Sequence, residues 1–156
     1  MGLDMYLNAN YYISQYSDAE LSAEIHKLLK FPFSAQGGTT VQIVSAYWRK
    51  SNQIHQWFVE NVQKGEDDCK PYDVGRSQLV ELRNLCATVL EDVDGMTDKD
   101  EIATYCEENL PTQQGFFFGS YDYDEYYFED LKSTIKQIDS VLTLPDSVWF
   151  TYQASW

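Results

Sequence analysis

The chain has 156 residues, of which 44% are hydrophobic and 15% aromatic, and it carries a formal net charge of −14 at pH 7. This length fits one domain whose core needs neither disulfides nor metal, and the hydrophobic content argues against a disordered chain. No apolar run reaches the roughly 18 residues of a membrane span, and no basic-then-apolar segment opens the chain, so we expect a soluble cytoplasmic protein.

The negative charge is concentrated in the second half of the chain. Residues 1–78 hold 9 acidic and 7 basic residues, whereas residues 79–156 hold 16 acidic and 4 basic residues. This balance disfavours direct binding to nucleic acid or to an anionic membrane. Two interpretations of the acidic half stay open: a solvated surface, or a surface that imitates DNA phosphates and occupies a nucleic-acid-binding protein.

The three cysteines do not form a recognisable pattern. Cys69, Cys86 and Cys106 lie 17 and 20 residues apart with no CxxC pair. This spacing suggests neither a zinc ribbon nor a disulfide scaffold, and it fits a reducing cytoplasm. We expect no cofactor and no bound metal.

Apolar periodicity predicts an α+β fold in a single domain spanning residues 1–156. Alternation of apolar and polar residues predicts strands at residues 3–10 and 148–156. A run rich in β-branched side chains predicts another strand at residues 39–46. Spacings of three and four predict helices at residues 17–30, 47–62, 76–92, 98–108 and 122–142. We therefore expect a small, largely antiparallel sheet with helices packed on one face, and the first and last strands in that sheet.

The helix predicted over residues 47–62 carries the most site-like residues. His55 falls within its apolar sector and Asn52 lies at the edge of that sector. Arg49 and Lys50 lie near the predicted helix start, where backbone N–H groups and the helix dipole favour an anion. Trp48 belongs to the same apolar sector.

A second unusual stretch is Gly115-Phe116-Phe117-Phe118-Gly119. Three adjacent phenylalanines in an extended run cannot all point into one core, because side chains alternate between faces. We therefore expect at least one of Phe116, Phe117 and Phe118 to line a cleft or an interface.

Several blocks of the chain resemble a family of small proteins carried by tailed phages and prophages. The resemblance rests on MGLDMYL at the start, YWRKSNQIHQWFVENV, the DDC of residues 67–69, LPTQQGFFFGS, YDYDEYYFEDL and the final Ser155-Trp156. Proteins of that family are often labelled phosphoglycerate kinase. This chain is too short for a two-lobed kinase and contains no Gly-rich phosphate loop ending in Lys-Ser or Lys-Thr. The resemblance implies a phage origin, action in the host cytoplasm and a single small domain.

Three interpretations of His55 stay open. It is a buried, hydrogen-bonded structural residue, a catalytic or metal-binding residue, or part of a ligand pocket. The second interpretation pairs His55 with Cys69 and with Asp67 or Asp68. The third predicts a pocket with amides for hydrogen bonds, a cation for an anionic group and an aromatic platform. Its residues are Trp48, Arg49, Lys50, Asn52, His55, Phe116, Phe117 and Phe118.

These features give three functional hypotheses. The first is a phage accessory protein that binds a small anionic, nucleotide-like ligand and counteracts host defence signalling. The second is an acidic, protein-binding antagonist or DNA mimic that inhibits a host nucleic-acid-binding protein. The third is a small hydrolase or transferase that uses His55. The sequence assigns no catalytic residue and no oligomeric state.

Overall fold

The strand β1 (Asp4–Ile13) is an inner strand of the sheet in the computed structural model, which describes residues 2–30 and 38–156. β1 pairs antiparallel with β2 (Thr39–Arg49) on one side and with β4 (Trp149–Ser155) on the other. β4 in turn pairs antiparallel with the short strand β3 (Tyr72–Val74), which gives the order β2-β1-β4-β3. The prediction that the first and last strands lie in one sheet is confirmed.

One face of this sheet supplies half of the hydrophobic core. Met5 is paired with Trp48 on β2, and Leu7 is paired with Tyr152 on β4, so all four side chains point the same way. Each is at most 3% exposed. Three helices cover this face: α2 (Asn52–Asn61), α3 (Arg76–Val93) and α5 (Glu125–Val141). Their buried side chains include Ile54, Phe58, Leu79, Leu82, Leu131 and Ile138.

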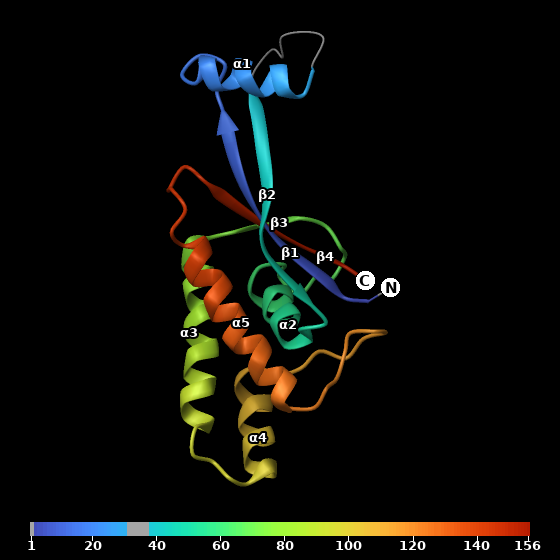
Figure 1. Cartoon of the computed structure of the whole chain (residues 1–156). Coiled ribbons are helices and arrows are strands. Elements are labelled where there is room, and N and C mark those ends of the chain that lie inside the picture. The colour runs from blue at the N-terminus through green and yellow to red at the C-terminus, as the bar shows by residue number, and fades with distance from the viewer. Residues whose placement is uncertain (1, 31–37) are drawn as a thin grey trace.

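The helices follow the predicted apolar stripes, and two of them begin at acidic caps. α3 and α5 lie side by side, and α4 (Lys99–Asn109) continues the helical body below them (Figure 1). Asp98 accepts hydrogen bonds from the first turn of α4, and Asp124 does the same for α5, which satisfies N–H groups that have no partner within the helix. In the described part of the chain, no helix is long and apolar enough to cross a membrane.

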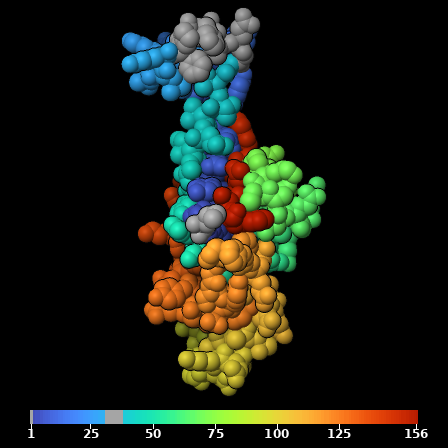
Figure 2. Space-filling model, turned by 90° about the vertical axis from the view of Figure 1, so that its right-hand side faces the viewer, coloured from blue at the N-terminus to red at the C-terminus, as the bar shows by residue number. Residues whose placement is uncertain are grey.

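The pairing of β1 with β2 continues beyond the rest of the sheet. β4 accompanies β1 only as far as the pair Asn10 and Trp149, whereas β1 and β2 stay paired to Ile13 and Thr39. The two strands therefore form a ribbon that projects from the helical body and carries α1 (Ala19–Leu28) at its far end (Figures 1 and 2).

The predicted start of the second helix is wrong. Residues 47–49 are the end of β2, and α2 begins only at Asn52. Tyr47, Trp48 and Arg49 pair with Tyr6, Met5 and Asp4, and the buried Trp48 alternates with its exposed neighbours. Pairing with β1 thus decides the conformation of a segment whose apolar residues also fit a helix. The three-residue strand β3 was not predicted.

Candidate functional site

A sharp turn joins β2 to α2 and places two cations side by side. Lys50 has a left-handed backbone (φ 60°), and its N–H donates to the Leu3 carbonyl at 2.8 Å. Non-glycine residues rarely adopt this conformation, so the surrounding contacts must hold it in place. The turn exposes the side chains of Arg49 and Lys50.

The loop of residues 111–124 packs against this turn. A Cβ atom on Gly119 would lie 2.8 Å from the Lys50 carbonyl oxygen, so only glycine fits this close approach. Asn52 holds the loop from the α2 side. Its Nδ2 atom donates to the carbonyls of Phe118 (3.2 Å) and Ser120 (2.8 Å), and its Oδ1 atom accepts the Gln113 N–H (3.2 Å). Asn52 is 1% exposed.

A pocket of about 690 Å³ opens between the turn, the loop and the start of α5. The first half of the chain contributes Arg49, Lys50 and Gln53 to its lining. The second half contributes Thr112, Phe117, Gly119, Ser120, Asp122, Asp124, Tyr126, Tyr127 and Asp130. The volume is in the range of small-molecule sites.

The charges in this pocket are mixed. The Arg49 Nε atom lies 3.9 Å from Asp4, which is a loose ion pair, and the Arg49 side chain is 61% exposed. No ion pair or hydrogen bond involves the Lys50 side chain within residues 2–30 and 38–156. Both cations are therefore available to an anionic group.

The carboxylates of the pocket face the same space from α5 and its preceding loop. Asp130 accepts a hydrogen bond from Gln53 at 3.2 Å. Burial raises the pKa of the Asp130 carboxyl above its ordinary value, and hydrogen bonds from Ser51 and Gln53 oppose part of that rise. Asp124 caps α5, and Asp122 accepts from the Ser120 hydroxyl at 3.3 Å. Their remaining oxygens can accept hydroxyl or amino protons from a ligand.

Two exposed aromatic side chains lie in the pocket lining, Phe117 (54% exposed) and Tyr126 (79% exposed). Phe117 also has a left-handed backbone, with φ 64°. Such strain in an exposed aromatic residue is common at ligand-binding sites. Phe116 is 84% exposed but is not part of the lining, and its ring packs on that of Phe117 at a centroid distance of 4.1 Å.

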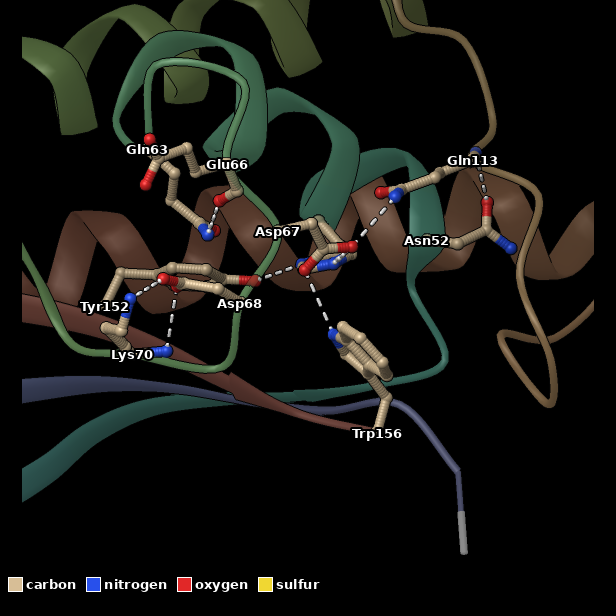
Figure 3. Close-up of polar contacts among 10 residues, drawn as sticks. Asn52, Gln63, Glu66, Asp67, Asp68, Lys70, Gln113, Tyr152 and Trp156 are labelled. Atoms are coloured by element: carbon tan, nitrogen blue, oxygen red, sulfur yellow. Dashed lines mark hydrogen bonds and ion pairs between the residues drawn. The ribbon is translucent and has the colours of Figure 1, made fainter.

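His55 is buried and lies outside this pocket, in a network of polar contacts. Its Nδ1 atom is 2.7 Å from the Tyr152 hydroxyl, and its Nε2 atom is 3.1 Å from the Asp67 carboxylate. The same carboxylate accepts from Trp156 Nε1 (3.0 Å) and Gln113 Nε2 (3.1 Å) (Figure 3). These polar contacts connect α2, β4, the loop after α2 and the loop of residues 111–124.

The protonation states of His55 and Tyr152 follow from their burial. Burial lowers the pKa of the His55 imidazole below its ordinary value of 6.5, and Asp67 opposes part of that shift. Burial also raises the pKa of the Tyr152 hydroxyl. A neutral histidine between a protonated tyrosine and a carboxylate accepts at Nδ1 and donates at Nε2. Both ring nitrogens are thus occupied, which favours the structural interpretation of His55.

The structure separates the eight predicted pocket residues into two groups. Arg49, Lys50 and Phe117 line the pocket, while Phe116 lies at its outside. The other four are buried: Trp48 (3% exposed), Asn52, His55 and Phe118 (4% exposed). Trp48 Nε1 donates to Thr134, and the Phe118 ring packs edge-on against His55.

The acidic residues of the pocket were missed at the sequence level. Asp122 and Asp124 entered the sequence analysis only as part of the helix predicted over residues 122–142, and Asp130 lies about one and a half turns into α5. Their only signal is the run of acids and tyrosines after the three phenylalanines. No spacing rule connects that run with Arg49 and Lys50, because the loop of residues 111–124 brings them together.

Among the described residues, the contacts of His55 match neither the Cys-His catalytic site nor the metal site considered in the sequence. Neither nitrogen of His55 bonds to Cys69, whose carbonyl accepts from Gln153 Nε2 at 3.0 Å. Within residues 2–30 and 38–156, no three His, Cys, Asp or Glu side chains come together as a metal site requires. Comparisons with protein-family models, curated proteins and solved structures gave no match.

Proposed function

We propose that the protein binds a small phosphate-bearing, nucleotide-like ligand in the pocket between the β2–α2 turn and the start of α5. The observation that carries this proposal is the convergence of two exposed cations, Arg49 and Lys50, with the exposed ring of Phe117 in one cavity of about 690 Å³. In a chain with net charge −14, adjacent exposed cations beside a cavity suit an anionic group of a ligand.

Each wall of the pocket suits a different part of such a ligand. A guanidinium and an ammonium group bind phosphate oxygens through charge-assisted hydrogen bonds. The rings of Phe117 and Tyr126 offer π-faces on which a base can stack. Asp122, Asp124 and Asp130 accept hydrogen bonds from ribose hydroxyls or from an exocyclic amino group. Their presence favours a ligand that also carries donors over a simple polyanion.

The resemblance to phage proteins gives this binding a biological setting. Bacterial defence systems use nucleotide-like molecules as alarm signals, and sequestering one would benefit a phage. Binding of such a molecule can be measured without assuming a defence pathway.

Thermal unfolding in the presence of a compound panel tests the proposal. The panel contains ribonucleotides, cyclic dinucleotides, the matching nucleosides and inorganic phosphate. A ligand at 100 times its dissociation constant should add about 2.7 kcal/mol to the free energy of unfolding. We expect stabilisation by at least one nucleotide, and much less by its nucleoside or by phosphate alone.

The matched variants are Arg49→Gln with Lys50→Gln, and Lys64→Gln with Lys99→Gln. Each pair removes two exposed positive charges, and Lys64 shares the left-handed backbone of Lys50. We expect the first pair to lose the ligand-induced stabilisation with little change in the unliganded melting temperature, and the second pair to keep it. Equal stabilisation of both variants would contradict the assignment of the two cations.

The acidic, protein-binding antagonist is the second candidate. It is favoured by exposed acids on the neighbouring helices α3 and α4, among them Glu91, Asp100, Glu101, Glu107 and Glu108. Co-purification with a nucleic-acid-binding protein, lost at high salt and on replacing these acids by Gln and Asn, would support this candidate. If the variant with Gln and Asn in place of these acids is still stabilised by a nucleotide, that result would support the pocket instead.

A further inference from the structure

We propose that two copies of the protein associate by antiparallel pairing of their β2 strands, which joins the two sheets edge to edge. β2 is an outer strand of the sheet, and β1 is its one hydrogen-bonded neighbour among the described strands. At 11 residues it is also the longest strand in that part of the chain. A long unpaired edge is a template for another strand.

Among the described residues, the outer edge of β2 lacks the usual protection against such pairing. Proteins block exposed edges with charged side chains, prolines or a covering helix. Residues 38–48 contain no charged residue and no proline. A hydrogen bond from the strand edge to α5 lies near the end of the strand, where the Tyr47 N–H donates to Gln137 Oε1 at 2.8 Å. The stretch from Val41 to Ser45 lies beyond this contact.

The distribution of charge identifies the occupant as a second copy. Neither residues 5–17 nor residues 38–48 contain a charged residue, although 23% of the chain is charged. Two copies with net charge −14 repel each other wherever their acidic helices approach. At the uncharged ribbon they can meet without opposed like charges. A basic partner would instead favour the acidic helices.

The side chains of β2 supply apolar area for this contact. Ile43 is 63% exposed and Val44 is 54% exposed, and as neighbours on a strand they point to opposite faces. A groove of about 300 Å³ adjoins them on the Ile43 side, lined by Ala9, Ile43, Ser45, Ser140, Val141, Leu144 and Val148. Antiparallel pairing of identical strands is two-fold symmetric, so each copy contributes the same apolar residues.

Sedimentation equilibrium of the full chain tests the inference. We expect a mass of about twice 18.1 kDa at micromolar concentration, and a dimer fraction that rises with added salt, because screening weakens the repulsion between copies. A mass of 18.1 kDa at all protein and salt concentrations would overturn the proposal.

Two valines provide a matched pair of variants. Val44 lies on the β2 edge, and Val80 is a 41% exposed valine on α3. We expect Val44→Lys to give a monomer, since two lysines then face each other near the symmetry axis, and Val80→Lys to leave the dimer intact. Ile43→Lys should repeat the effect of Val44→Lys, with circular dichroism checking that each variant is folded. An unchanged dimer dissociation constant in both β2 variants would exclude this interface.

Discussion

Phe116 and Phe117 are adjacent in the chain and differ in their relation to the pocket, which only Phe117 lines. Base stacking on an aromatic ring contributes about 1–3 kcal/mol, so Phe117→Ala should weaken nucleotide binding by about 5- to 150-fold. Phe116→Ala removes an equally large exposed ring and should leave the affinity within about twofold. The affinities of the two variants can be compared by isothermal titration calorimetry, with the nucleotide that stabilises the wild type as the ligand. Equal losses would move the aromatic platform away from Phe117.

The burial of His55 predicts how the stability of the protein depends on pH. Because burial lowers the pKa of His55 in the folded protein, the unfolded chain binds a proton that the folded chain does not between that lowered value and 6.5. The contribution of His55 to stability is therefore fully present above pH 6.5 and is lost as the pH falls through this window. Urea unfolding at pH 8, 7, 6 and 5 should show a steeper decline in the wild type than in His55→Gln.

The control variant is His26→Gln, which removes the other histidine of the chain and leaves the bonds of His55 to Tyr152 and Asp67 in place. A decline that His55→Gln reduces and His26→Gln leaves unchanged would assign the pH effect to His55. His55→Gln should also cost about 1–3 kcal/mol at pH 8, because it disturbs the buried bonds to Tyr152 and Asp67. Nucleotide binding by the folded His55→Gln protein should persist. Loss of binding at unchanged stability would place His55 in the functional site.

At the scale of elements, Asn52 joins α2 to the loop of residues 111–124 through three hydrogen bonds. Asn52→Ala should destabilise the protein by about 1–3 kcal/mol, because it leaves buried carbonyl and N–H groups without partners. It should also weaken nucleotide binding, since the loop carries one wall of the pocket. Asn61→Ala, which removes a hydrogen bond to Trp57 on the same helix, is the control. Wild-type affinity in folded Asn52→Ala would show that the loop holds its position without this residue.

The helices and the three long strands were predictable because each carries its own apolar period. The start of α2 was not, since Tyr47 and Trp48 fit a helical stripe as well as a strand, and only pairing with Tyr6 and Met5 decides between the two. β3 has three residues, which is too short for a period to be detected. Its pairing with β4 is a tertiary contact that the sequence does not encode locally.

The candidate site was only half predictable for a similar reason. Arg49 and Lys50 are visible as adjacent cations in an acidic chain, and Phe117 as part of an unusual aromatic run. Whether such a residue lines a pocket or fills the core depends on packing. Phe118 is buried against His55, whereas Phe117, one residue earlier, has a left-handed backbone and is 54% exposed.

At the scale of the whole molecule, the pocket lies where the two halves of the chain meet. Its cations come from the β2–α2 turn, and its carboxylates come from the acidic second half, near α5. A ligand held by both halves stabilises the folded state against global unfolding. The ribbon that carries α1 projects away from the helical body (Figure 1). Pairing through β2 and ligand binding are therefore tested by separate variants.

The most direct test of the central claim is a mass spectrum of the small molecules that the purified protein retains. We expect the wild type to release a compound that contains both phosphate and a nucleobase. The variant Arg49→Gln with Lys50→Gln should release none, while Lys64→Gln with Lys99→Gln should match the wild type. A retained compound without phosphate, or equal amounts of the same compound from both double variants, would contradict the proposed pocket.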